Sequence, residues 1–330
     1  EVVWTRMLTQ IFGNTTYAIA TVLAFFMAGL ALGSYFFGKF ADRRKNDFLL
    51  YGLLEAGVGI YGLLVPQLFK IGQALYIPLY GINESYPFVF NLLLFALSFV
   101  LLVFPTILMG ATLPVLSRFF VHSLAHLGRR VGDLYATNTL GAVIGCAAAG
   151  YYVIPTFGMR DAVFLAAGLN LVIAGLIIIV DRLRQKDVVV ELVEEVPAPS
   201  AAEVSDPAPS WLTWVLLGSF GLSGFCALVY ENAWTRALTM VLGSSVYSFT
   251  TMLVTFLIGL ALGGFLYARL LGEREARVST FGLVELMIGL AALATIPLFE
   301  RLPLLFLRFL SGFGYSFVMF LTIQLLLSAL

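Results

Sequence analysis

The sequence is poor in charge. Only 12% of its 330 residues are Asp, Glu, Lys or Arg, and 19 basic residues balance 19 acidic ones. Soluble domains carry about a quarter charged residues, so this composition argues against a soluble globular protein. A net charge of zero leaves no basic field for nucleic acid, and no nucleic-acid partner is predicted. The two cysteines, Cys146 and Cys226, fall in apolar stretches, where packing is their expected role.

Residues that carry catalysis or hold metals are equally scarce. The two histidines, His122 and His126, have a helical i, i+4 spacing but no third ligand nearby, so no metal site is predicted. No Ser/His/Asp or Cys/His set is placed for catalysis, and no cofactor is predicted. GSFGLSG (218–224) resembles a phosphate-binding loop, but it lies in an apolar stretch without a preceding strand, so helix packing explains it.

What the sequence does have is apolar length. Sixty per cent of its residues are apolar and the mean hydropathy is +0.97. Many stretches approach the roughly 20 residues that a helix needs to cross a hydrocarbon core of about 30 Å. We therefore predict an all-α, multi-pass membrane protein with the lipid bilayer as its surroundings. About nine spans are predicted, at 14–38, 48–69, 87–108, 134–155, 161–181, 211–231, 244–268, 278–299 and 313–330.

The chain also repeats itself. EVVWTR (1–6) returns as ENAWTR (231–236), and residues 1–40 match 231–270 at 16 positions, including GLALG at 29–33 and 259–263. The same register pairs Glu55 with Glu285. An internal duplication of this kind predicts two copies of one structural unit.

The repeat predicts a six-plus-six arrangement. A full apolar span, 211–230, precedes the second box, and nothing precedes the first, so the first copy is expected to lack its first span. The second copy is expected to lack its last two. We therefore divide the chain into an N-terminal helical repeat (1–184), an acidic Pro/Ala-rich linker (185–210) and a truncated C-terminal repeat (211–330).

Basic residues predict the orientation. If the missing first span begins in the cytoplasm, 13 Lys and Arg residues lie in cytoplasmic loops and six lie outside. The excess on one side predicts a cell (inner) membrane protein with a cytoplasmic linker and outward-facing boxes.

The two boxes are candidate binding sites. Glu and Trp at i and i+3 share a helix face, and a carboxylate beside an indole suits an organic cation. The alternative is an aromatic belt at the membrane surface, with Glu and Arg paired locally. The candidate residues are Glu1, Trp4 and Arg6 in the first box and Glu231, Trp234 and Arg236 in the second.

Glu55 and Glu285 are candidates of another kind. Glu55 lies eight residues beyond Asp47, about 12 Å into a helix. A carboxylate at this depth is costly, so it is expected to have a function or to form an ion pair with a loop arginine. Small residues flank both glutamates, at Gly52/Gly59 and Gly282/Gly289, and predict close helix contacts.

Further candidates lie on loops and small-residue faces. LYATNTLGAVIG places Gly141, Gly145 and Ala149 on one face, with Asn138 as a possible substrate contact or, by preference, an interhelical hydrogen bond. Pro105 and Pro114 bracket ILMGATL and predict a bent or broken helix end. The candidate loop or gating residues are Gly38, Asp42, Arg43 and Arg44 in GKFADRRK, and Arg274 and Arg277 in its counterpart.

These motifs carry a resemblance. Two six-span halves, the GKFADRRK turn and a long middle linker resemble the major facilitator superfamily. VYENAWTRAL, FPTILMGATLP, LYATNTLGAVIG and IPTFG (154–158) resemble more specifically the membrane region of fused transporter/spermidine synthase-like proteins. The resemblance implies a soluble aminopropyltransferase-like domain after the membrane region, and hence polyamine chemistry that these residues do not themselves carry.

Two main functions remain open at this point. One is a transporter-like domain that moves or senses a polyamine or a related small cation by alternating access. The other is a membrane anchor or gating module for a cytoplasmic transferase, without transport of its own, in which case the full-length protein is an enzyme. A ligand-free scaffold is a third. The number of polar residues within the spans discriminates between a transporter and the other two functions. The predicted spans contain few of them: Thr21, Asn138, Asn170, Thr251 and Gln324.

Overall fold

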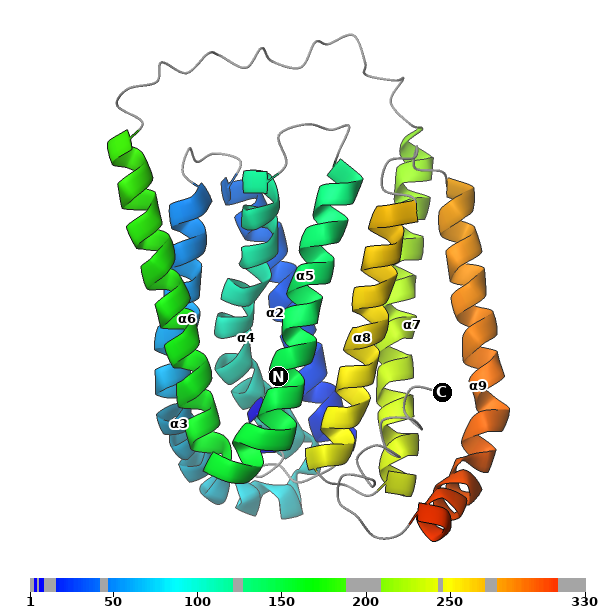
Figure 1. Ribbon diagram of the computed structural model, residues 1–330. Helices are drawn as coiled ribbons and strands as arrows, with labels where there is room; N and C mark the ends of the chain where they lie inside the picture. The colour runs from blue at the N-terminus through cyan, green and yellow to red at the C-terminus, as the bar shows by residue number, and fades with distance from the viewer. Residues whose placement is uncertain are drawn as a thin grey trace.

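The protein is a bundle of long helices. The computed structural model describes residues 3–4, 6–8, 16–41, 47–120, 127–187, 209–242, 246–270 and 278–313, and all regular structure in these ranges is helical. Figure 1 shows the helices standing side by side, with their long axes roughly parallel. Seven helical segments are long and apolar enough to cross a membrane. The predicted all-helical, multi-pass architecture is therefore confirmed, while the predicted span at 313–330 lies almost wholly outside the described residues.

One of these segments is long enough to cross twice. Arg130–Leu183 has 54 residues, about 80 Å of helix, far more than a single crossing needs. It comprises α5 (Leu127–Ala148), the π-helix η2 (Ala149–Val153) and α6 (Ile154–Asp187). The chain reverses at Gly158, whose φ of 84° lies in the region that glycine adopts without a Cβ penalty. The P-x-x-G motif at residues 155–158 forms this turn.

The first half packs through glycine. The helices α2 (Thr16–Ala41) and α4 (Pro87–Phe120) approach so closely that a Cβ at Gly29 would collide with the Thr106 side chain. A Cβ at Gly33 would likewise collide with the backbone of Ile107. The helix α4 runs unbroken through Pro105 and Pro114, so the predicted helix break is wrong. Neighbouring helices commonly satisfy the backbone groups that such prolines free within a membrane.

The second half begins with a helix longer than predicted. The helix α7 extends over Ser210–Leu242, not 211–231, so the second box lies within it and does not follow it. The helices α8 (Val246–Leu270) and α9 (Val278–Phe313) come next. In Figure 1 both α2 and α8 end at the upper side, where α6 ends and α7 begins; this side is called the linker side. These two corresponding helices therefore point in the same direction.

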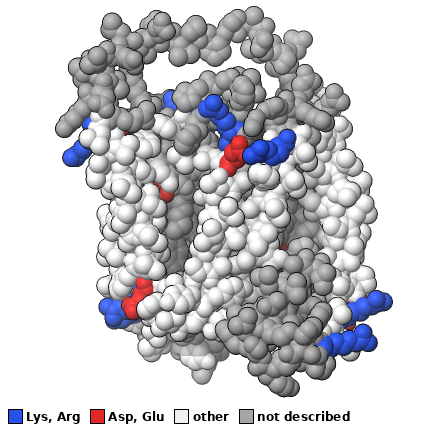
Figure 2. Space-filling view, viewed as in Figure 1, with Lys and Arg blue, Asp and Glu red and all other residues white. Residues whose placement is uncertain are grey.

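Charge gathers at the ends of the bundle. Figure 2 shows Lys and Arg near the top and bottom of the view and a broad band between them that is almost free of both signs of charge. Lys39 and Arg269 lie in the last turns of α2 and α8, at the linker side. Arg301 and Arg308 lie toward the opposite end of α9. This distribution is the one expected of a protein whose middle faces hydrocarbon.

Candidate functional site

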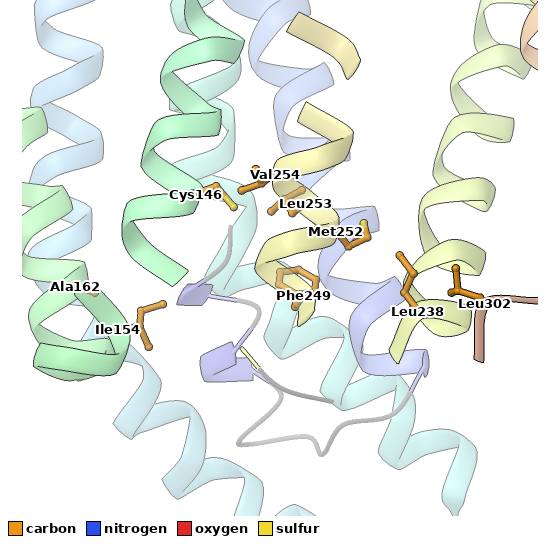
Figure 3. Packing of buried hydrophobic residues seen from close by; sticks show 9 residues of the cluster. All are labelled: Cys146, Ile154, Ala162, Leu238, Phe249, Met252, Leu253, Val254 and Leu302. Carbon is orange, nitrogen blue, oxygen red and sulfur yellow. The ribbon is translucent and has the colours of Figure 1, made fainter. Parts of the chain in front are cut away.

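The two halves meet where α8 packs against α5. A cluster of buried apolar residues spans this junction, and Figure 3 shows Cys146 of α5 beside Val254 and Leu253 of α8. The same cluster reaches α7 and α9 through Leu238 and Leu302, which lie together in Figure 3. The helix α8 therefore packs against both α5 and α7. Polar groups on α8 are placed between the two halves.

The first turns of α8 are rich in buried hydroxyl groups. Ser248, Thr250 and Thr251 are all at most 1% exposed. Thr251 donates its hydroxyl proton to the Tyr247 carbonyl (2.7 Å), and Thr255 donates to the Thr251 carbonyl (2.8 Å). Such i−4 bonds let threonine lie inside a helix bundle without an interhelical partner. Thr250 is the exception, because its Oγ1 has no hydrogen-bond partner among the described residues.

The helix α7 supplies the buried carboxylate of this region. Glu231 is only 5% exposed, although it lies within the membrane-spanning segment Ser210–Met240. It is nine residues from Met240, about 14 Å along the helix. Thr235, one turn further, donates to the Glu231 carbonyl (2.6 Å) and approaches the Met252 sulfur of α8 at 3.6 Å. The buried face of the second box is therefore turned toward α8.

The other residues of the second box differ in how far they are buried. The Trp234 indole is half-buried and stacks on the Tyr230 ring, with centroids 5.5 Å apart and an interplanar angle of 15°. Arg236 is exposed. The box thus presents a buried carboxylate and, beside it on the helix, a pair of aromatic faces. An organic cation is recognised by this combination of charge and ring faces.

The first box is placed differently. Trp4 is 8% exposed and packs edge-on to Tyr61 of α3 (Asp47–Ser85), with ring centroids 6.5 Å apart. An indole in the protein core does not belong to an aromatic belt, so that alternative is wrong for Trp4. Arg6 is half-buried, and Glu1 lies outside the described residues. Val3 packs against both the Trp4 cluster and the junction cluster, so the first box borders the same junction.

Glu55 lies on the side of the bundle where α3 meets α6. A Cβ at Gly52 would lie 2.9 Å from Ile177, and one at Gly59 would lie 2.8 Å from Leu171, so the close contact predicted for this face is confirmed. Glu55 is half-buried, and Tyr51 hydrogen-bonds to its carboxylate. The basic turn 42–46 lies outside the described residues, and contact between Glu55 and a turn arginine stays a prediction.

Glu285 differs from its counterpart. It is half-buried on α9 and makes no hydrogen bond or ion pair with any residue in the described ranges. A Cβ at either Gly282 or Gly289 would meet nothing within 4 Å. The predicted close contact on this face is therefore not made by the described helices.

The remaining predicted residues lie apart from the junction. Asn138 is exposed on α5 and forms no hydrogen bond within the described part of the chain. A Cβ at Gly141 or Gly145 would meet nothing within 4 Å among the described residues, so the described helices do not make the predicted close approach there. The close approach to α8 occurs instead at Gly132 of α5 and at Gly150 of η2. Gly38 lies near Pro114, whereas the five other gating candidates lie outside the described residues, namely Asp42, Arg43, Arg44, Arg274 and Arg277.

Sequence reasoning missed most of the polar junction. Thr251 was among the few polar span residues singled out, but Thr235, Thr250 and Tyr151 were not. The available signal was SSVYSFTTMLVT (244–255), an unusual density of hydroxyl groups in a span. Such a density marks an interhelical face more often than a lipid-facing one, because small polar residues are enriched where membrane helices meet.

The bundle of long apolar helices is that of a multi-pass membrane protein. Comparison with known families matches residues 2–330 to the Major Facilitator Superfamily, and the chain belongs to this family. No curated protein and no solved structure matched the chain. The family match supports the transporter part of the predicted resemblance. Fusion to a spermidine synthase-like domain is not shown by it.

Proposed function

We propose that this membrane transporter moves a small organic cation, a polyamine or a related amine, between its two halves by alternating access. The buried carboxylate of Glu231 is the observation that carries the proposal. It lies inside a membrane-spanning helix, next to the stacked rings of Tyr230 and Trp234, on a helix that packs against the junction. An acidic residue in this position is a candidate for the substrate pathway.

The architecture behind the proposal is a pair of parallel six-span repeats. The matching sequences of 1–40 and 231–270 and the common direction of α2 and α8 support it. We propose residues 1–184 and 211–330 as the two repeats and 185–210 as the linker. An axis along the membrane normal would relate the repeats, which suits rocking of one half against the other.

We also propose that the linker side faces the cytoplasm of a cell (inner) membrane. The basic residues of the described helix ends support this orientation: Lys39, Arg118, Arg130, Arg182 and Arg269 all lie at that side. Protease cleavage of the linker in sealed, inside-out vesicles but not in intact cells is the expected result. Cleavage from the outside would reverse the orientation.

The direct test of function is cation uptake with a charge-neutral substitution. Purified protein in proteoliposomes is given radiolabelled spermidine, and Glu231→Gln is compared with Glu300→Gln. Glu300 is exposed in the C-terminal half of α9 and serves as the matched control. Loss of a buried charge partner is worth 1.4 kcal/mol or more, so we expect uptake to fall at least tenfold in Glu231→Gln alone. Equal uptake in both variants would remove Glu231 from the substrate path.

A second candidate function is supported by the motifs and by the shortage of polar residues. VYENAWTRAL and LYATNTLGAVIG resemble a membrane region that is fused to an aminopropyltransferase-like domain, and Asn138 is turned away from the described helices. Such a chain would anchor the transferase or gate its access to substrate without transport. In that case the liposomes take up no spermidine, and Glu231→Gln changes transferase activity of the full-length protein instead.

A further inference from the structure

The contact between α5 and α8 has two ends of different chemistry. At the linker end the helices meet through small and apolar groups: a Cβ at Gly132 would lie 2.9 Å from the Ala268 Cβ, and one at Gly264 would lie 3.1 Å from the Tyr135 ring. At the end near Gly158 the contact also includes hydroxyl groups, beside the apolar cluster of Cys146, Phe249 and Val254. This second end carries the inference.

Its central contact is a hydrogen bond between Tyr151 and Thr251. The two hydroxyl oxygens are 2.8 Å apart. Thr251 has one hydroxyl proton, and it is donated to the Tyr247 carbonyl of its own helix. Tyr151 is therefore the donor across the junction. The Tyr151 ring also stacks on Tyr247, with centroids 6.4 Å apart and planes 8° from parallel.

The same end contains an unsatisfied group. Gly150 packs so closely on Thr250 that a Cβ there would overlap the threonine side chain, and the Thr250 hydroxyl is fully buried without a partner in the described residues. A buried unpaired hydroxyl is less favourable than a hydrated one. Opening of this end would let water reach Thr250. The hydrogen bond at Tyr151 favours the closed arrangement, and the Thr250 hydroxyl opposes it.

The local backbone is unusual as well. Gly150 and Tyr151 both belong to the π-helix η2 (Ala149–Val153). Single π-turns within helices are rare and occur often at functional sites. Here the wide turn presents a glycine and a tyrosine to the same face of α8.

We propose that Tyr151, Thr251 and the Gly150–Thr250 contact form a polar latch between the two halves, which opens at the Gly158 end while the apolar linker end acts as the pivot. The latch deepens the proposed function, since it rests on movement of one half against the other. Breaking one hydrogen bond shifts its opening equilibrium severalfold.

The chain contains its own reporter. Cys146 is 7% exposed and lies in the same contact, with its sulfur 4.0 Å from the Thr250 carbonyl. With Cys226→Ala as background, opening of the latch is the event that exposes the remaining thiol. The protein is placed in lipid nanodiscs, where both membrane faces are accessible, and alkylation by a charged, water-soluble maleimide is followed by mass spectrometry.

The variants remove either a group that favours the closed latch or the group that opposes it, and this makes the test specific. Tyr151→Phe keeps the ring and Thr251→Val keeps the shape, and each is expected to raise the alkylation rate about fivefold, the effect of one hydrogen bond. The double variant should react no faster than either single one, because the same bond is lost. Thr250→Val removes the unpaired hydroxyl and should slow the reaction. Thr255→Val is the control, since Thr255 bonds only within its own helix.

Each outcome decides the proposal. Equal rates in all variants, the same acceleration in Thr255→Val, or no alkylation in any of them would overturn the latch. The assay needs no substrate. A protein that shows the expected rates but takes up no spermidine therefore keeps the latch and loses the proposed cation, and the reverse result loses the latch alone.

Discussion

The two halves use the same glycines in different surroundings. In the first half, Gly29 and Gly33 of the GLALG run are pressed against α4, and Gly59 against α6. In the second half, a Cβ at Gly259 or Gly263 of the identical run would meet nothing within 4 Å in the described ranges, and the same holds for Gly289. A small-residue motif thus indicates that a helix can be approached closely. It does not identify the neighbour that approaches.

The largest effect is expected where the comparison is sharpest. Gly33→Leu would drive a side chain into the α4 backbone at Ile107, and backbone cannot move aside as a side chain can. We expect a loss of about 3 kcal/mol or more of stability, seen as little folded protein after mild heating and size-exclusion chromatography. Gly263→Leu, the matched control, is expected to stay within about 1 kcal/mol. Equal losses would mean that the Gly263 face is covered in the protein as it exists in the membrane.

The two box tryptophans test the comparison next. Trp4 is buried against Tyr61, whereas Trp234 is half-buried and stacks on Tyr230 of its own helix. Trp4→Ala leaves a cavity in the core and should cost about 3–5 kcal/mol. Trp234→Ala should cost about 1 kcal/mol and act mainly on cation uptake. The thermal unfolding midpoints of the two variants are compared in the same detergent. A larger drop for Trp234→Ala than for Trp4→Ala would contradict the difference in placement.

The smallest effect concerns the paired glutamates. Tyr51 bonds to Glu55, but the residue that corresponds to Tyr51 in the second half is Phe281, which has no hydroxyl for Glu285. Tyr51→Phe should lower stability by about 1.5 kcal/mol. Phe281→Tyr should raise it by up to about 1 kcal/mol, because the repeat supplies the same i, i+4 geometry. The thermal unfolding midpoints of both variants are measured, with Tyr267→Phe as an exposed control. A lower midpoint for Phe281→Tyr would show that the geometry at Phe281/Glu285 differs from that at Tyr51/Glu55.

Much of the architecture could be predicted from sequence. Apolar length predicted an all-helical, multi-pass bundle, and the described residues confirm it. The number of spans and the correspondence between helices, which the box and GLALG repeats indicate, stay predictions. Helix ends were less predictable, because α7 continues through ENAWTR and α4 continues through Pro105 and Pro114. In a membrane, backbone groups are satisfied within the helix, so polar boxes and prolines end helices less often than they do in water.

The site was harder to predict than the fold. Glu231 stood out because ENAWTR repeats EVVWTR and places a carboxylate three residues before an indole. Tyr151 and Thr250 did not, since tyrosine and threonine are ordinary span residues and their roles depend on which helix lies opposite. On α5 the predicted face, Gly141 and Gly145, lies about half a turn from the face that is used at Gly132 and, in η2, at Gly150. Periodicity alone does not choose between two small-residue faces of one helix.

The π-helix has a consequence for how this sequence should be aligned. Cys146, Gly150 and Ile154 are spaced four positions apart and would drift around an α-helix by about 40° per step. All three are nonetheless buried, because the wide turn of η2 holds them nearer to one column. Such a turn acts in evolution as an insertion of one residue that the helix absorbs without a loop. A relative with a single-residue gap between 149 and 153 would keep both crossings, restore a regular α-helix, and lose the register that brings Tyr151 to Thr251.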